Sequence, residues 1–236
     1  MLVKTKAIVL HTIRYQEKNL IARCYTRACG IKSYFIRGAY GKGRKAPYFQ
    51  PLNILDLQAI HKNKGTLEAL REVSLSFCYQ TVNSQILKSS LAVFIAEVLH
   101  HALKEEQPNE PFFDFLEAAF EWLDNHEETA NFHLIFLLQA TRYLGFYPDT
   151  SEGHLSFFDL KEGCFSPNET LSCTSSENTE LLQKLLKTTF DTESRIFSNL
   201  QRKQLLSVLL DYYQLHLDGF VRPRSVEVFQ EVFAMP

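Results

Sequence analysis

A glycine-rich stretch is the first feature of this sequence whose residue types could do chemistry. It reads Gly38-Ala39-Tyr40-Gly41-Lys42-Gly43. A nucleotide-binding P-loop has the spacing G-x-x-x-x-G-K-S/T, in which backbone amides cradle the phosphates and the hydroxyl holds magnesium. Here the first glycine lies too close to the lysine, and Gly43 stands where the hydroxyl residue is needed. The GXXG of a KH domain also fits poorly, because a strand is expected before this stretch. We interpret it as a flexible basic loop.

Histidines and cysteines, the usual ligands of structural zinc, are poorly spaced for a metal site. His126 and His133 lie seven residues apart, too far for a pair at i and i+4 on one helix face. Cys164, Cys173 and His154 are loosely spaced ligands without a C-x-x-C pair, and such sets rarely make a closed tetrahedral site. The sequence also lacks a G-x-S-x-G nucleophile elbow. We therefore expect no metal, no cofactor and no catalytic residue.

The cysteines and the hydropathy bound the compartment. The chain has five cysteines, an odd number without paired spacing, which indicates reduced thiols rather than a disulfide framework. No window supplies the roughly 18 apolar residues that a membrane span needs, and the N-terminus has no signal-peptide pattern. We therefore expect a cytoplasmic protein.

Charge is divided unevenly along the chain, although the formal net charge is only −2. The first 80 residues hold 14 Lys and Arg against 4 Asp and Glu, a formal charge of +10. The remaining 156 residues hold 11 Lys and Arg against 23 Asp and Glu, a formal charge of −12. A segment as basic as the first repels itself and attracts polyanions. We predict a basic polyanion-binding domain at 1–80 and an acidic domain at 81–236.

The basic segment is predicted to form a small β-barrel. Short runs rich in β-branched, aromatic and aliphatic residues alternate with glycine-containing turns. These runs are Thr5–Leu10, Leu20–Thr26, Ile31–Gly38 and Leu52–His61. Period-two alternation places Arg23 and Tyr25 on one face of the second run, and Lys32 and Tyr34 on one face of the third. Basic and aromatic side chains therefore alternate on faces that could carry a nucleic-acid strand.

From about residue 67 onward the apolar residues recur with a helical period. Helices are expected at 87–102, 112–123, 130–144, 179–190, 195–217 and 225–233. Residues 150–178 interrupt this pattern with a polar segment in which Leu155–Leu160 and Cys164–Phe165 look like a hairpin. The predicted fold class is α+β: a small N-terminal barrel followed by an all-α helical domain with a hairpin insertion.

Several short motifs follow one another in a fixed order along nearly the whole chain. They include Ala7-Ile8-Val9-Leu10, Thr26-x-x-x-Gly30, Phe35-Ile36-Arg37-Gly38-Ala39, Tyr143-Leu144-Gly145-Phe146-Tyr147-Pro148 and Arg224-Ser225-Val226-Glu227-Val228. In this order they resemble the RecO family of bacterial recombination mediators. The resemblance implies an N-terminal OB-fold, a helical C-terminal domain and a non-enzymatic role at the nucleoid. It also implies binding of single- and double-stranded DNA and annealing of complementary strands.

Basic side chains and two tyrosines of the barrel are the predicted DNA contacts. Lys and Arg release counterions from phosphates without sequence preference, and a tyrosine stacked on a base is worth about 1–3 kcal/mol. The predicted contacts are Arg23, Tyr25, Arg27, Lys32, Tyr34, Arg37, Lys42, Arg44 and Lys45. For both tyrosines the alternative is packing inside the barrel, since Tyr is often half-buried in strands.

The resemblance also implies protein partners. These are RecR, sometimes RecF, and the single-strand-binding protein SSB, from whose DNA complex the family helps to load RecA. The acidic SSB tail ends in Phe, so its receptor needs an apolar pocket with a basic rim. Arg142, in an otherwise apolar helix, is the candidate contact. The alternative is an Arg that faces solvent or has a partner within the chain.

One departure from the family pattern concerns zinc. Many relatives carry a four-cysteine zinc element just after the Gly-Phe-Tyr-Pro helix end. Here the segment Asp149–Thr179 keeps only Cys164 and Cys173. We expect that the zinc element is lost and that a hairpin holds the same place without metal.

Two other classes of function stay open at this stage. One is an RNA- or ribosome-associated barrel protein with a helical scaffold. Competition between structured RNA and single-stranded DNA for binding would distinguish it from a DNA-binding recombination mediator. The second is an enzyme with a pocket in the helical bundle, which ranks last because no polar motif converges there.

Overall fold

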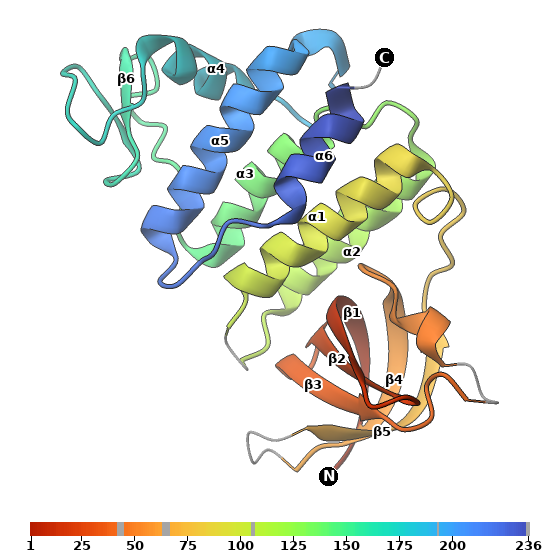
Figure 1. The fold of residues 1–236 in the computed structure, drawn as a ribbon. Coiled ribbons are helices and arrows are strands. Elements are labelled where there is room, and N and C mark those ends of the chain that lie inside the picture. The colour runs from red at the N-terminus through yellow and green to blue at the C-terminus, as the bar shows by residue number, and fades with distance from the viewer. Residues whose placement is uncertain (42–44, 63–66, 105–106, 193, 235–236) are drawn as a thin grey trace. The chain divides into compact units, whose positions relative to one another are not determined.

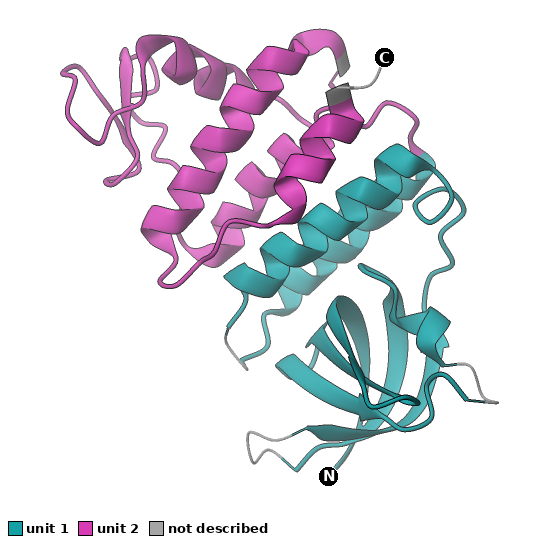
Figure 2. Ribbon diagram, viewed as in Figure 1, with its two compact units in different colours: residues 1–125 teal, residues 126–236 magenta. Residues whose placement is uncertain are grey.

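A computed structural model describes residues 1–41, 45–62, 67–104, 107–192 and 194–234 of the chain. These residues divide into two compact units, Met1–Asn125 and His126–Pro236 (Figure 2). The division predicted from charge lies at residue 80, whereas the first compact unit continues to residue 125 because it includes two helices that follow the barrel. The two-domain division at residue 80 stays a prediction.

A closed five-stranded barrel forms the N-terminal part of the first unit (Figure 1). Its strands are β1 (Leu2–Tyr15), β2 (Asn19–Thr26), β3 (Gly30–Ile36), β4 (Ile54–Ile60) and β5 (Glu68–Leu75). They are joined in the order β1-β2-β3-β5-β4, and all pairs are antiparallel except β3–β5, which is parallel. Closure gives each of the five strands two neighbours, with β3 and β5 joined through Tyr34–Glu68 and Phe35–Ala69. The predicted OB-like barrel is confirmed.

The fifth strand corrects the expectation that helical structure begins near residue 67. Glu68–Leu75 contains good helix formers and shows no clear alternation of apolar residues. Its first residues nevertheless pair in parallel with Tyr34 and Phe35 of β3, while the rest of the strand pairs with β4. Pairing with strands far away in the sequence therefore outweighs the local propensity of this segment.

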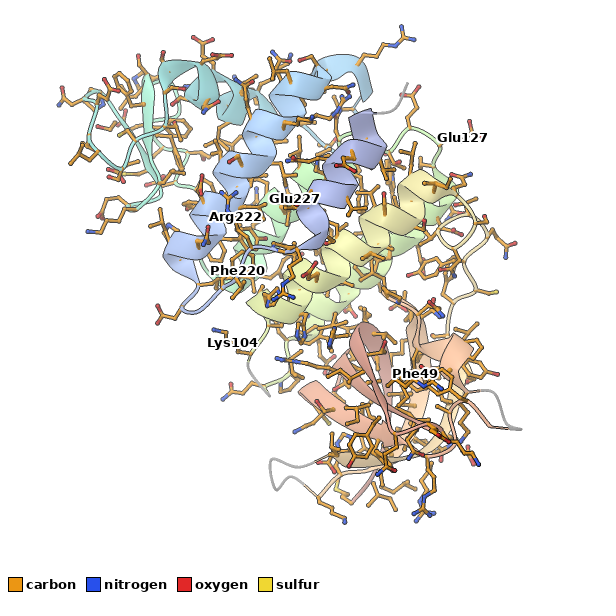
Figure 3. All side chains as sticks on the ribbon, in the orientation of Figure 1. Phe49, Lys104, Glu127, Phe220, Arg222 and Glu227 are labelled. Carbon is orange, nitrogen blue, oxygen red and sulfur yellow. The ribbon has the colours of Figure 1, made fainter. Side chains whose placement is uncertain are left out.

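The barrel core comes from residues that alternate inward along the strands. Buried members of β1, β2, β3 and β4 include Ala7, Val9, Leu20, Ala22, Cys24, Tyr34, Ile36, Leu55, Leu57 and Ala59. The 3-10 helix η1 (Ala46–Phe49) adds Phe49, which belongs to the same buried cluster (Figure 3). The loop between β3 and β4 is thus anchored to the barrel.

Two helices complete the first unit: α1 (Ile86–Ala102), which contacts β1, and α2 (Glu110–Asn125). The buried carboxylate of Asp124, in the last turn of α2, accepts hydrogen bonds from the backbone amides of Gln80, Thr81 and Val82. Lys88 of α1 donates to the main-chain oxygen of Asp124 at 2.9 Å. This network fastens the connection between barrel and helices to both helices.

The second unit contains the remaining predicted helices and the hairpin. Its elements are α3 (Phe132–Leu144), β6 (Phe157–Asp159), β7 (Cys164–Ser166), α4 (Ser176–Leu186), η2 (Ser194–Ile196), α5 (Asn199–His216) and α6 (Ser225–Ala234). Helix α3 is buried along most of its length and contacts α4 and α5 (Figure 1). It ends at Gly145, whose φ of 87° is left-handed and suits glycine. Within the described residues, no helix is long and apolar enough to cross a membrane.

Candidate nucleic-acid interface

Strand register decides which predicted contacts face into the barrel. Ala22 pairs with Tyr34 and Cys24 pairs with Lys32, so these residues share the inner face of β2 and β3. Tyr34 is 0% exposed and Lys32 is 8% exposed. The Tyr34 hydroxyl lies 3.0 Å from His61 Nε2, and burial raises the pKa of Tyr34. The predicted stacking of Tyr34 on a base is corrected, because its ring lies inside the barrel, and Lys32 is likewise withdrawn from solvent.

Arg23 and Tyr25 lie on the outer face of β2, but the following helices cover them. The ring of Tyr25 lies 5.8 Å from that of Phe112, and its hydroxyl donates to the main-chain oxygen of Asn109 at 3.1 Å. Burial raises the pKa of Tyr25 to about 12. Arg23 donates from Nη2 to the main-chain oxygen of Leu103, the residue that caps α1, and burial lowers its pKa. The predicted stacking of Tyr25 is corrected for this reason, and both side chains hold helices to the barrel.

Arg27 is half-buried at the turn between β2 and β3, and its charge is already paired. It lies 2.8 Å from a carboxylate oxygen of Glu110 and 2.9 Å from one of Asp114, both in α2. Lys6 is paired in the same way with Glu117 at 2.6 Å. The acidic face of α2 therefore neutralises the barrel cations nearest to it.

The remaining predicted contacts follow β3. Arg37 is exposed and Lys45 is half-buried; neither side chain has a partner among the residues that the structure describes. Lys42 and Arg44 lie outside the described residues. Arg37 and Lys45 therefore stay predicted DNA contacts, whereas the predicted contacts Arg23, Tyr25 and Arg27 are engaged with the helices that follow the barrel.

Several candidate contacts at this end were missed by sequence reasoning. Strand β1 continues to Tyr15, five residues beyond its predicted end. Tyr15 and Tyr40 are 46% and 45% exposed. The guanidinium carbon of Arg14 lies 4.9 Å from the centre of the Tyr40 ring, and the rings of Tyr15 and Phe35 meet edge to face at 6.1 Å. The alternation in His-Thr-Ile-Arg-Tyr was the signal that could have extended the strand.

Two hydrogen bonds bring these residues together. The Gly38 amide donates to the Asn19 side-chain oxygen at 3.0 Å, and the Tyr40 amide donates to the main-chain oxygen of Lys18 at 3.2 Å. The turn between β1 and β2 therefore lies beside the loop that follows β3. We call this region the basic aromatic surface, and it comprises Arg14, Tyr15, Lys18, Phe35, Arg37, Tyr40 and Lys45.

The chemistry of the basic aromatic surface suits a nucleic-acid strand. Its four cations can neutralise phosphates, and its exposed rings can stack on bases. Glu17 is the acidic residue of the β1–β2 turn, and its main-chain oxygen accepts a hydrogen bond from Arg14 at 3.0 Å. OB-folds bind oligonucleotides at the face of strands 2 and 3 and at neighbouring loops. Here the helices cover one part of that face and leave the part near the β1–β2 turn open.

In the second unit, Arg142 contacts residues close to it in the chain. Its guanidinium lies 3.7 Å from the centre of the Tyr147 ring, and its Nε donates to the Gln139 side-chain oxygen at 2.9 Å. The side chain is exposed in the last turn of α3. These contacts agree with the alternative interpretation of an Arg that faces solvent and has partners within the chain.

A small hollow among α3, α5 and α6 combines an apolar wall with basic side chains, as was expected of a pocket near Arg142. Leu206, Phe229 and Phe233 supply apolar wall, and Arg202 and Lys203 supply positive charge. His133 also lines it, and the buried Nδ1 of this histidine has no hydrogen-bond partner. Burial, and then the charge of Arg202, lowers the pKa of His133 to about 3. The hollow is therefore lined by aromatic rings. At neutral pH its positive charge comes from Arg202 and Lys203, because His133 is not protonated.

The hairpin between α3 and α4 is organised by a carboxylate. Asp159 accepts hydrogen bonds from the amides of Lys161 and Glu162 and from the hydroxyls of Thr170 and Ser172, at 2.8 to 3.1 Å. Among the described residues, no three His, Cys, Asp or Glu side chains are grouped so that they could hold a metal. Asp159 thus joins the hairpin turn to the segment before α4 through hydrogen bonds.

Two family models match consecutive parts of the chain. The model described as Recombination protein O N terminal matches residues 1–79, and the model described as Recombination protein O C terminal matches residues 83–225. The chain belongs to the RecO family. Relatives in this family include the DNA repair protein RecO of Flavobacterium johnsoniae, which is 47% identical over 237 residues, covering 99% of this chain and 100% of the relative.

Two further RecO proteins show the same full-length match. The DNA repair protein RecO of Flavobacterium psychrophilum is 48% identical over 238 residues, and that of Christiangramia forsetii is 40% identical over 240 residues. Each alignment covers 99% of this chain and 100% of the relative. The resemblance drawn from the order of the motifs is confirmed, and the barrel followed by helices is the fold that this RecO resemblance implied.

Proposed function

We propose that this protein is a non-enzymatic mediator of DNA repair and recombination that binds single- and double-stranded DNA and anneals complementary strands. The observation that carries the proposal is the basic aromatic surface, where Arg14, Lys18, Arg37 and Lys45 gather beside exposed aromatic rings. The names of the RecO relatives support a role in DNA repair. We propose that the protein carries out this role at the nucleoid.

Annealing follows from electrostatics without an energy source. Two complementary strands repel each other through their phosphates, and cations that neutralise phosphates on both strands lower this repulsion. Aromatic stacking holds unpaired bases without sequence preference, so that complementary bases can test one another. Binding that is independent of sequence and sensitive to salt is the expected consequence.

Strand annealing is the experiment that tests this function. Fluorescently labelled complementary oligonucleotides, bare or coated with SSB, are mixed with the protein, and duplex formation is followed with time. We expect annealing to be faster with the protein and to be slowed by the triple variant Arg14→Glu, Lys18→Glu, Arg37→Glu. Two results would favour an RNA-associated barrel protein instead. One is annealing that is no faster with the wild-type protein than without it; the other is structured RNA that competes with single-stranded DNA and binds equally well.

We further propose that the helical unit binds the acidic tail of SSB and that RecR, sometimes with RecF, acts with the protein to load RecA. The hollow among α3, α5 and α6 supports the first part, because Lys203 and Arg202 stand beside Phe229 and Phe233. Acidic peptides are steered by such positive charge, and an aromatic end packs against rings. Arg142, stacked on Tyr147, keeps its place as the alternative contact.

A peptide titration separates the two candidate positions. A labelled acidic peptide ending in Phe is titrated with the wild-type protein, with Lys203→Glu and with Arg142→Ala. Both side chains are exposed, so either substitution should leave the fold intact. Weaker binding by Lys203→Glu alone would support peptide binding in the hollow, whereas weaker binding by Arg142→Ala alone would indicate that the peptide binds at the end of α3.

A further inference from the structure

A second hollow opens in the barrel beside the basic aromatic surface. It has a volume of about 420 Å³ and lies between β1, the start of β2 and the loop that carries η1. This volume falls within the range of about 300–1,000 Å³ that small-molecule sites occupy. Tyr40, Pro47 and Phe49 provide apolar wall, and Thr12 and Gln50 provide polar groups. The hollow is thus large enough for a flat heteroaromatic group and is mixed in character.

The polar groups of the hollow are available to a ligand. Within the described part of the chain, neither the Thr12 hydroxyl nor the Gln50 amide has a hydrogen-bond partner. Each can donate and accept a hydrogen bond. A nucleobase has apolar faces and a polar edge of donors and acceptors, so a wall of Tyr and Pro with two adaptable polar groups matches it without selecting one base.

Charge around the hollow favours a ligand attached to phosphates. Arg14 lies over the ring of Tyr40, which lines the hollow, and Lys45 directly precedes Ala46, which also lines it. No acidic side chain is among the described residues of the lining. A different hollow of similar size, next to β4 and β5, is lined among the described residues by Asp56 and Glu72 against the single cation Lys4, so its charge is less favourable for the same ligand.

We propose that the hollow beside Tyr40 receives one unpaired nucleobase of a bound DNA strand. The inference rests on the proposed DNA-binding function and adds to it a preference for single strands, since a base held in a duplex cannot enter. The neighbouring phosphates lie on Arg14 and Lys45, and the Thr12 and Gln50 side chains adapt their hydrogen bonds to whichever base enters. Annealing then withdraws the base from the hollow as its complement pairs with it.

An abasic oligonucleotide separates base binding from phosphate binding. Fluorescence anisotropy compares the affinity of the full-length protein for an oligo-dT strand and for an abasic strand of equal length and charge. We expect the dT strand to bind about tenfold more tightly, as one stacked and hydrogen-bonded base would give. Thr12→Val with Gln50→Ala, and separately the filling substitution Ala46→Phe, should reduce this preference and leave the abasic affinity unchanged.

Gln58→Ala is the matched control, because Gln58 lines the acidic hollow on another part of the barrel. It should keep the full preference for dT. Equal binding of dT and abasic strands by the wild-type protein would overturn the inference, and so would an undiminished preference in the folded Thr12→Val, Gln50→Ala variant. Failure of the wild-type protein to bind either strand would instead remove the proposed DNA-binding function itself.

Discussion

Removing the charge of Arg37 should weaken DNA binding, whereas removing that of Arg27 should not. Arg27 is half-buried and paired with Glu110 and Asp114, while Arg37 is exposed and has no partner among the described residues. A guanidinium whose charge is already balanced releases few counterions when a phosphate approaches. The pair Arg37→Ala and Arg27→Ala therefore tests the location of the interface with the same chemical change.

The magnitude follows from counterion release. Each phosphate contact on a single strand contributes about 0.7 to the slope of log K against log salt concentration. If the affinities with and without one contact are taken as equal at about 1 M salt, the loss of that contact lowers the affinity about fourfold at about 0.15 M salt. The triple variant Arg14→Ala, Lys18→Ala, Arg37→Ala should lose a slope of about 2 and an affinity of about 50-fold.

Fluorescence anisotropy of a labelled single strand, repeated over a series of salt concentrations, measures both quantities. Thermal unfolding of each variant serves as the folding control, since none of the three side chains is buried. A reduced slope for Arg37→Ala together with an unchanged slope for Arg27→Ala would support the basic aromatic surface. The opposite order, or equal losses from both substitutions, would refute this placement of the DNA.

Three further substitutions test the framework that holds the sites. Asp124→Asn should destabilise the first unit by about 3 kcal/mol in urea unfolding. The reason is that an amide nitrogen replaces a carboxylate oxygen that accepts from the backbone amides of residues 80–82. A loss of stability under about 1 kcal/mol would contradict this account. Burial alone would raise the pKa of Asp124, but these hydrogen bonds lower it overall, so the stability that they provide is present at neutral pH and lost as pH falls through the acid range. His133 stays neutral when folded, with its pKa lowered from 6.5 to about 3, so stability should decrease as pH falls from 6.5 toward 3, and His133→Leu should flatten this dependence in thermal melts. Asp159→Ala should speed limited proteolysis between β6 and α4, and an unchanged cleavage rate would show that the hairpin does not depend on the carboxylate.

Local patterns in the sequence determined much of the fold. Apolar residues with a helical period located the helices, and Gly145 marked the end of α3 because its left-handed backbone suits glycine. Alternating runs located β2, β3 and β4, and the polar segment at 150–178 contained the hairpin. The excess of Lys and Arg in the first 80 residues led to the prediction that the barrel binds nucleic acid, which stays a prediction. The features of the fold succeed because each depends on residues that are neighbours in the chain.

Only the tertiary structure decided which of the charged and aromatic residues are available. Alternation showed that Tyr34 and Tyr25 lie on particular faces of their strands, but it could not show that the first face is the interior or that α2 covers the second. Likewise, the pairing of Arg27 with Glu110 joins residues that are far apart in the sequence. Such contacts depend on barrel closure and helix packing, so the open end of the barrel around Arg37 could be recognised only once the strands and helices were in place.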